Sequence, residues 1–256
     1  MNPAGLRIFD LEQPRYFGAP SHPGHVPPGY SYILHRHHAP GSPEARTSAS
    51  GVITSSDHSG THIDALCHQA ENLALHGGAD AAGAQTAFGF SSHGVERIAP
   101  IVVTGRLIDL GQTEPGGWIG LPEVRAAAEA QGVEPGPGEV LLVRTGNGAH
   151  WAEPERYNMG SGLDREVSEW AAGCGVLAVG ADNLAWDWIK GQDPELGVSL
   201  PGHVVLLVRH GIHIIENLFL EELAAAAVHA FTFVCLPLKL RGATGSPVRP
   251  VALVEA

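Results

Sequence analysis

Cysteine is scarce in this chain of 256 residues, and its few cysteines form no pattern. The three thiols, Cys67, Cys174 and Cys235, are an odd number, and no two of them stand in a C-x-x-C spacing. A disulfide framework needs paired cysteines, and a cysteine-type zinc site needs closely spaced ones. The sequence therefore argues against both and predicts ordinary thiols of a reducing compartment.

Positive charge and long apolar runs are scarce as well. The chain has only 15 Lys and Arg residues against 27 Asp and Glu residues, so its net charge is −12. The basic residues form no cluster. This balance argues against nucleic acid or an anionic membrane as a partner. No window approaches the ~18 apolar residues of a membrane span, and the first residues lack the basic start and apolar stretch of a signal peptide. We therefore expect a cytoplasmic protein that acts on a small molecule.

Two common functional signatures are missing. Neither G-x-G-x-x-G nor G-x-x-x-x-G-K-[ST] occurs, which argues against nucleotide binding. Ser246, in Thr-Gly-Ser-Pro, lacks the strand-to-helix G-x-S-x-G setting of a serine nucleophile. Any catalytic chemistry must therefore come from other side chains.

Histidine, by contrast, is abundant: the chain has 15 histidines, as many as Lys and Arg together. Histidine is the commonest metal ligand and the usual acid/base group near neutral pH. One group, His35, His37 and His38, lies in residues 1–50, which are rich in Pro, Gly, His and Ser. Such a composition predicts an irregular N-terminal arm, serving as a lid or an oligomer contact. These three histidines either line a substrate entrance or, as we expect, belong to a solvated loop.

Residues 51–256 predict a single domain of the α/β class. Short apolar runs predict strands, and stretches with helix start and stop signals predict helices between them. The predicted strands are 52–54, 100–109, 139–144, 176–180, 204–208, 212–216, 231–236 and 251–254. The predicted helices are 122–131, 164–174 and 220–227.

The segment from Asp57 to His68, Asp-His-Ser-Gly-Thr-His-Ile-Asp-Ala-Leu-Cys-His, holds three histidines and two carboxylates. Divalent metals bind imidazole and carboxylate groups, and a hydrolytic site keeps one position open for water. The spacing predicts His58, His62 and Asp64 as metal ligands. His68 follows Asp64 by four residues, which suits a general acid/base group above the water. The alternative is that His58 and His62 are surface residues of a helix, but Ser-Gly between them is a poor helix start.

The motif resembles the H-x-G-T-H-x-D-x-x-x-H signature of the cyclase-type metal-dependent hydrolases, a family that includes kynurenine formamidases and isatin hydrolases. Further segments resemble family landmarks in family order: 105–109, 140–146, 178–182, 211–218 and 244–250. The resemblance implies a swivelling β/β/α domain around a barrel-like mixed sheet, usually assembled as a homodimer or homotetramer. One departure is Leu66, which stands where the formamidases usually have proline.

Carried over by residue, the resemblance implies metal ligation by His58, His62 and Asp64, with His68 as proton donor and acceptor. It also implies a second metal held by His203 and Glu216 on two adjacent strands, with Asp64 bridging. The metal would be Mn²⁺ or Zn²⁺.

These observations lead to one expected function and two alternatives. We expect hydrolysis of an amide, either a cyclic amide or an N-acyl aromatic compound, by a metal-activated water with His68 as the proton shuttle. The alternatives are a non-hydrolytic metal-dependent cyclase and a lactone or ester hydrolase. Two further features stay open at this level: Trp186 and Trp188 either wall an aromatic pocket or belong to the core, and Asp182 either orients a ligand or closes a turn.

Overall fold

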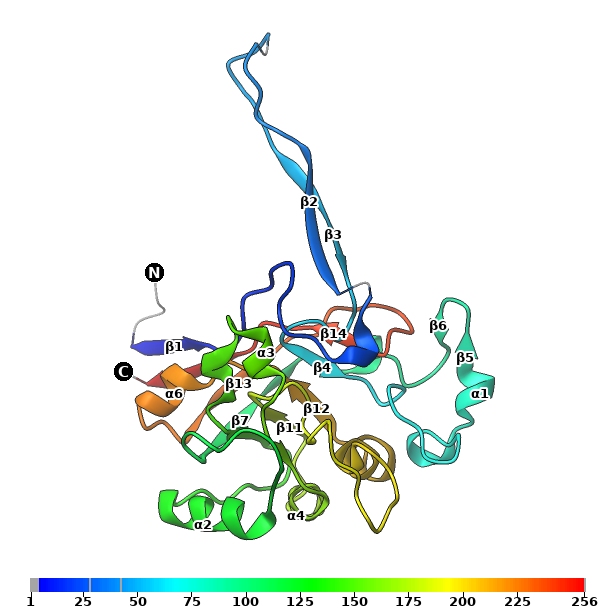
Figure 1. The fold of residues 1–256 in the computed structure, drawn as a ribbon, viewed down its shortest axis with the longest axis vertical. Coiled ribbons are helices and arrows are strands. Elements are labelled where there is room, and N and C mark those ends of the chain that lie inside the picture. The colour runs from blue at the N-terminus through cyan, green and yellow to red at the C-terminus, as the bar shows by residue number, and fades with distance from the viewer. Residues whose placement is uncertain (1–4, 28, 42, 256) are drawn as a thin grey trace.

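The computed structural model describes residues 5–27, 29–41 and 43–255, and its centre is a curled nine-stranded mixed sheet (Figure 1). The strand order is β1-β15-β13-β7-β9-β11-β12-β4-β14. The bounds of these strands are β1 Leu6–Asp10, β4 His62–Asp64, β7 Ile101–Asp109, β9 Val140–Arg144, β11 Ala178–Ala181, β12 His213–Glu216, β13 Ala230–Cys235, β14 Gly245–Pro247 and β15 Val251–Glu255. Three small pairs lie outside this sheet: β2 Tyr30–Arg36 with β3 Ser50–Ser55, β5 Gln85–Thr86 with β6 Gly89–Phe90, and β8 Trp118–Ile119 with β10 Gly162–Leu163.

The centre of the sheet is parallel and its two flanks are antiparallel. Strands β7, β9, β11 and β12 run parallel to one another, and the remaining pairings are antiparallel. The residues from Val140 to Val143 in β9 are all buried, as expected for a central parallel strand that is covered on both faces. The predicted α/β class and barrel-like mixed sheet are thus confirmed.

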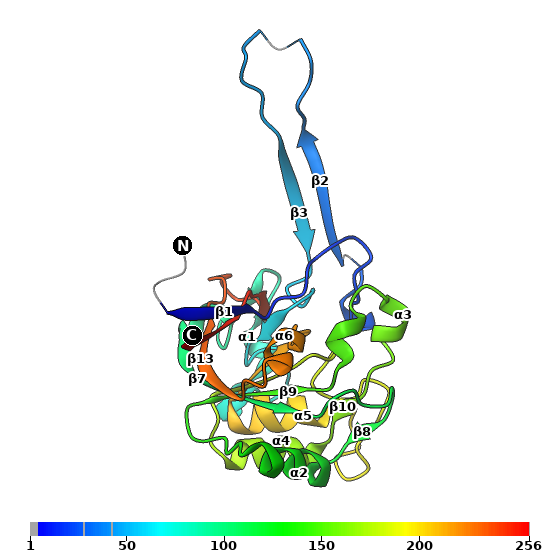
Figure 2. The same ribbon diagram turned by 90° about the vertical axis from the view of Figure 1, so that its left-hand side faces the viewer.

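Three helices cover one face of the parallel strands (Figure 2). They are α2 (Leu121–Gln131), α4 (Arg165–Gly173) and the continuous helix of α5 (Pro201–His203) and η5 (Val204–His210). The shorter helices are α1 Ala81–Ala84, α3 Pro154–Tyr157, α6 Glu221–Ala225, η1 Pro23–His25, η2 His76–Gly78, η3 Val95–Arg97 and η4 Asn147–His150. No helix among the described residues is long and apolar enough to cross a membrane.

Local sequence signals fix the ends of two of these helices. The side chain of Asp164 accepts a hydrogen bond from the backbone N–H of Val167 at 2.9 Å and so caps α4. Helix α2 ends at Gly132, whose φ of 64° is the left-handed conformation that glycine adopts without strain. The predicted helices at 122–131, 164–174 and 220–227 are confirmed as α2, α4 and α6, with ends that differ by a few residues.

The predicted strand at 204–208 is wrong. Residues Val204–His210 form the π-helix η5, which continues α5 and ends at Gly211 with a φ of 67°. A short, fully apolar run does not by itself separate a buried strand from a buried helix. Here the five residues 204–208 are all buried in the core between helix and sheet. The other predicted strands are confirmed.

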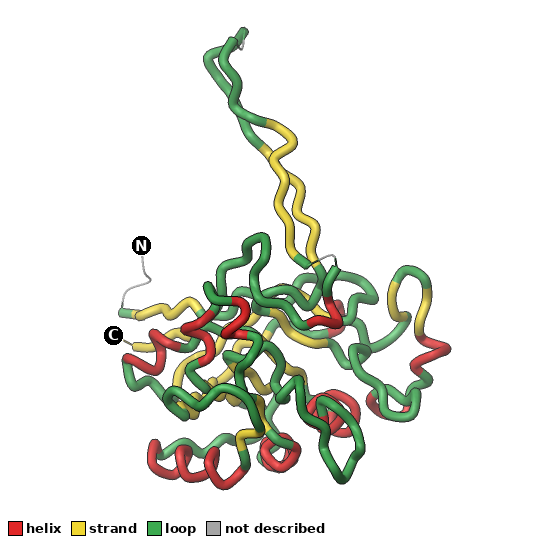
Figure 3. The backbone as a smooth tube through the Cα atoms, in the orientation of Figure 1, coloured by secondary structure: helices red, strands yellow, loops and turns green. Residues whose placement is uncertain are grey.

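The N-terminal arm is more ordered than its composition predicts. Strand β1 pairs antiparallel with β15 at the edge of the central sheet. Strands β2 and β3 form a long hairpin that projects from the body (Figures 1 and 3). Tyr30, Tyr32 and Ile33 in β2 are residue types that favour strands, and they outweigh the neighbouring prolines and glycines. The boundary drawn between residues 50 and 51 therefore falls inside β3.

Candidate active site

Strands β4 and β12 bring three of the candidate residues onto one face of the sheet. Side chains alternate along a strand, so His62 and Asp64 share one face while Ile63 packs into the core on the other. Glu216 on β12 lies directly opposite His62, and opposite residues of an antiparallel pair share a face. His62 Nε2 lies 3.3 Å from Glu216 Oε2 and 3.5 Å from Asp64 Oδ1. The extended backbone thus gathers one imidazole and two carboxylates.

The loop before β4 places His58 beside this group. Its Nδ1 lies 2.9 Å from Asp64 Oδ1. The ring packs over Gly245, where a Cβ atom would lie 2.7 Å from His58 Cε1. Only glycine leaves room for the imidazole at that position.

Hydrogen bonds fix the tautomer of His58. The hydroxyl of Thr244 donates to Asp57 Oδ2 at 2.8 Å, and Thr244 Oγ1 also lies 2.8 Å from His58 Nε2. Because its hydrogen is used on the carboxylate, the hydroxyl accepts from His58 Nε2–H. This leaves a lone pair on Nδ1, directed at Asp64.

The other two imidazoles are held in the same way. His62 Nδ1 donates to the carbonyl oxygen of Gly60 at 2.8 Å. His203 Nδ1 donates to Asp187 Oδ2 at 2.7 Å. Its Nε2 then lies 3.3 Å from Glu216 Oε1 and 3.5 Å from Asp64 Oδ2. Each of the three histidines therefore turns one lone pair toward the same two carboxylates.

The two carboxylates are buried yet ionised. Burial raises the pKa of Asp64, but the neighbouring imidazoles of His68 and His58 outweigh it and hold that pKa well below its usual range. Burial likewise raises the pKa of Glu216, and the neighbouring imidazoles of His203 and His62 lower it to a net value below the ordinary one. Burial also lowers the pKa of His62, but the neighbouring carboxylates of Glu216 and Asp64 leave that pKa raised. The site thus favours positive charge between the carboxylates.

The residues present fit a divalent metal. His58 Nδ1, His62 Nε2 and both carboxylate oxygens of Asp64 are buried without a hydrogen-bond partner. Lone pairs and anionic oxygens that face each other repel, and a cation removes the repulsion. Within the described residues, three groups of side chains have their ligand atoms within 4.8 Å of one another, and two of these groups contain Asp64. His58, His62 and Asp64 form one of the two donor groups with Asp64, and Asp64, His68 and His203 form the other. Imidazole and carboxylate donors suit first-row divalent ions.

All six predicted site residues converge, although not all from the predicted elements. His203 lies on helix α5, so its placement on a strand next to that of Glu216 is wrong. The ring centroid of His68 lies 4.0 Å from that of His58 and 6.0 Å from that of His203. Burial lowers the pKa of His68 to about 3, so its imidazole is neutral at pH 7. Since its donor atom also lies within the second donor group, its acid/base role stays a prediction.

The other residues that the sequence analysis singled out lie in the core, in a turn or on the surface. Trp186 is fully buried in the core under the helices, and its Nε1 donates to Ser168 Oγ at 2.9 Å. Asp182 closes the turn after β9 by accepting from the backbone N–H groups of Thr145, Gly146 and Gly148. Cys67 Sγ points to the carbonyl oxygen of Ala243 at 3.6 Å. The histidines at 35, 37 and 38 are exposed at the outer end of the hairpin.

Three residues at the site were missed by the sequence analysis: His25, Asp187 and Thr244. Each is distant in sequence from the residue that it contacts, and no local spacing links them. Only the abundance of histidine pointed toward His25.

The fold and this donor set define a metal-dependent hydrolase. The model of the Cyclase family, described as Putative cyclase, matches residues 9–188, and the chain belongs to this family. The kynurenine formamidase of Bordetella avium is 31% identical over 247 residues, covering 96% of this chain and 97% of that relative. The kynurenine formamidase of Bacillus cereus is 27% identical over 247 residues, covering 95% of each chain.

Solved structures agree in fold. A novel cyclase matches with a TM-score of 0.85 and 25% identity, covering 98% of this chain and 87% of that chain. Isatin hydrolase A from Ralstonia solanacearum matches with a TM-score of 0.74 and 21% identity, covering 98% of this chain and 92% of that chain. Together with the family match and the curated relatives, the donor set makes the chain an enzyme, a metal-dependent hydrolase of carbon–nitrogen bonds other than peptide bonds.

Proposed function

We propose that this protein hydrolyses the amide bond of an N-acyl aromatic compound or of a cyclic amide. The observation that carries the proposal is the convergence of three imidazole lone pairs on two buried, ionised carboxylates, with the neutral ring of His68 beside them. The relatives named kynurenine formamidase and the structural neighbours named isatin hydrolase support this class of substrate. Leu66, which departs from the formamidase pattern, argues against assigning kynurenine chemistry in particular.

The proposed chemistry divides between the metal and the side chains. A divalent ion held by His58, His62 and Asp64 would lower the pKa of a water molecule and polarise the substrate carbonyl. His68 accepts the proton as the water oxygen bonds to the carbonyl carbon. It then donates that proton to the nitrogen as the carbon–nitrogen bond breaks, which gives a carboxylic acid and an amine.

Other side chains keep the site in its working geometry. The hydroxyl of Thr244 fixes the ring of His58, and the carboxylate of Asp187 fixes that of His203. Such outer contacts orient ligands and raise their basicity. His203 and Glu216 are proposed to hold a second ion, with Asp64 shared between the two donor groups.

The metal is proposed to be Mn²⁺ or Zn²⁺. A carboxylate-rich site leans to Mn²⁺, whereas a bridged pair of ions leans to Zn²⁺. The two donor groups that share Asp64 favour the pair. Elemental analysis of the purified protein, with the count of ions per chain, tests both the identity and the number.

A substrate panel tests the function. Formanilide, a lactam and phenyl acetate are offered to the chelator-treated protein before and after addition of Mn²⁺ or Zn²⁺. We expect cleavage of formanilide or the lactam that requires the metal and returns when it is restored. Faster cleavage of the ester than of any amide would favour the ester or lactone hydrolase. Metal binding without hydrolysis of any member would favour the non-hydrolytic cyclase.

The hairpin of β2 and β3 is proposed to be a contact with a second copy of the chain, in a homodimer or homotetramer. It exposes Tyr32, Ile33, Val52 and Ile53, each more than half accessible. A two-stranded hairpin alone is at best marginally stable in water. Contact with a partner surface would bury these apolar residues and stabilise the hairpin. A cytoplasmic location is also proposed, supported by three cysteines that are all free thiols.

A further inference from the structure

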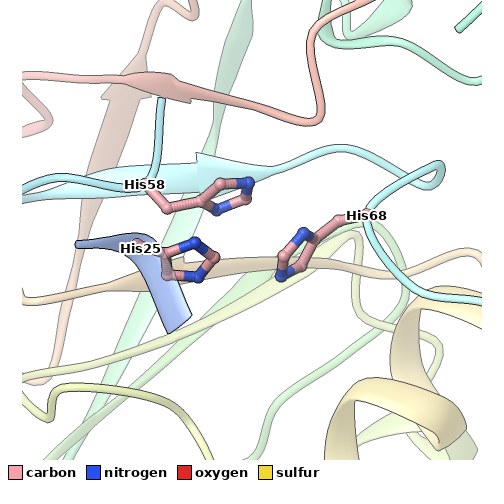
Figure 4. Close-up of side chains that lie close together, drawn as sticks. All are labelled: His25, His58 and His68. Carbon is pink, nitrogen blue, oxygen red and sulfur yellow. The ribbon is translucent and has the colours of Figure 1, made fainter. Parts of the chain in front are cut away.

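His25 reaches the proposed active site from a segment outside the histidine motif. It ends the helical turn η1, and its ring lies 4.6 Å from that of His58 at an interplanar angle of 16°. Its distance to the ring of His68 is 5.7 Å, at an angle of 41°. Figure 4 shows the three rings, from three segments, gathered around one space. The donor atoms of the three lie within 4.8 Å of one another.

The chain that leads to η1 is fastened to the motif itself. The backbone N–H of Gln13 donates to Thr61 Oγ1 at 2.9 Å. The Nε of Arg15 donates to the carbonyl oxygen of Ser59 at 3.2 Å. Because Ser59 and Thr61 stand between His58 and His62, the N-terminal segment is positioned by the same loop that positions two ligand candidates.

Stacking argues that His25 is not a metal ligand next to His58. The lone pair of an imidazole nitrogen lies in the plane of its ring, and a ligated ion lies about 2.0–2.1 Å away along that lone pair. Two rings at a centroid distance of 4.6 Å and an angle of 16° have nearly parallel planes, which do not meet at one ion. His58 is already committed to Asp64 and Thr244.

The ring nitrogens of His25 are free for another partner. In the part of the chain that the structure describes, its ring contacts are those with His22, His58 and His68, and no hydrogen bond uses its Nδ1 or Nε2. One face of the ring is covered by His58. The ring lies beside the space between His58 and His68, which is where the proposed hydrolysis places the reacting carbonyl.

We propose that His25 is a substrate-binding residue whose ring nitrogen forms a hydrogen bond with the oxygen of the acyl group being cleaved. The proposal rests on the proposed amide hydrolysis. It makes the N-terminal segment part of the substrate site, with the stack on His58 holding the imidazole edge toward the substrate.

Two substitutions at His25 separate the effect of the hydrogen bond from the effect of the stacked ring. His25→Phe keeps a flat ring to stack on His58 and removes the hydrogen bond, whereas His25→Asn keeps a polar group and removes the ring. The matched control is His210→Asn, because His210 is an exposed histidine at the end of η5. For each protein we would measure metal content, melting temperature, kcat and KM for formanilide, and the calorimetric Kd for formanilide.

His25→Phe is expected to raise KM and Kd about 3–10-fold, the contribution of one neutral hydrogen bond. Its kcat should fall as well, because the acyl oxygen gains negative charge in the transition state and the lost hydrogen bond is worth more there. Its metal content should stay unchanged. His25→Asn is expected to recover part of the affinity, and His210→Asn should match the wild type.

Each other result contradicts the proposal. Loss of metal in His25→Phe would make His25 a ligand, and a lower melting temperature with unchanged Kd would make it structural. Equal Kd values in wild type and variant, including no measurable binding by either, would remove it from the substrate site. A wild type that binds formanilide without cleaving it would refute the proposed function, while the Kd comparison would still decide the role of His25.

Discussion

Replacing Asp187 by asparagine is expected to weaken metal binding through His203 without removing any ligand. Asp187 is 1% exposed and makes three contacts with both of its oxygens. Oδ1 accepts from Gly202 N–H at 2.6 Å, and Oδ2 accepts from His203 N–H at 3.1 Å and from His203 Nδ1 at 2.7 Å. An amide has one acceptor oxygen and one donor nitrogen, so it cannot serve both sides.

The magnitude follows from the position of the lost contact. If the amide nitrogen faces His203, the ring loses the acceptor that keeps the proton on Nδ1 and the lone pair on Nε2. Loss of such an outer-shell partner typically costs 10–100-fold in metal affinity, which is about 1.4–2.7 kcal/mol at 25 °C. We expect the ion nearest His203 to show this loss and the ion at His58, His62 and Asp64 to be nearly unaffected.

Titration of the metal-free protein with Zn²⁺, in competition with a chelator of known affinity, measures the effect. Asp164→Asn is the matched control, since Asp164 caps α4 through Val167 N–H but does not contact the site, and asparagine caps a helix equally well. A Zn²⁺ affinity in Asp187→Asn equal to that in Asp164→Asn would refute the reasoning. Melting temperatures of both metal-free variants show whether any difference arises only from stability.

Five further substitutions test the rest of the site and the hairpin. His62→Ala and Asp64→Ala should each lose metal by elemental analysis, and full occupancy in both would mean that the ligands lie elsewhere. His68→Ala should keep its metal and lose ~10²–10⁴-fold in rate; loss of metal instead would make His68 a ligand, and a near-normal rate would end its role as proton shuttle. Gly245→Ala places a methyl group 2.7 Å from His58 Cε1, so urea unfolding should show a loss of about 1–3 kcal/mol together with weaker metal binding, and wild-type values would show that the ring has room to move. Ile33→Glu, at a residue that is 66% exposed, should halve or quarter the mass measured by light scattering while leaving the melting temperature of the body unchanged, and an unchanged mass would place the contact elsewhere.

Much of the ligand set could be predicted from the sequence because it depends on local geometry. His62 and Asp64 are two residues apart, and a strand with a period of two places them on one face whatever surrounds them. His58 needs only the short turn through Gly60, whose φ of 64° suits glycine. The spacing of the motif is therefore enough to predict that these three side chains lie together.

The partners of these residues depend on the order of strands, which no local pattern encodes. Glu216 meets His62 only because β12 pairs with β4 in that register, and its assignment came from family resemblance. His203 was expected on a strand, since an apolar run after it fits a buried strand and a buried helix equally. In the tertiary structure His203 lies on helix α5. Asp187 accepts a hydrogen bond from the backbone of α5 at Gly202 and also holds the ring of His203.

Thr244 and His25 show the same limit most clearly. Thr244 lies 186 positions from His58 along the chain, and His25 precedes the motif in a segment whose composition predicted an irregular arm. The sequence alone predicted His58, His62 and Asp64 as a set of donors, because ligand type and strand period are local properties. Only the tertiary structure decided which nitrogen of each imidazole is free and which residues surround these donors, because both depend on contacts between segments that the sheet brings together.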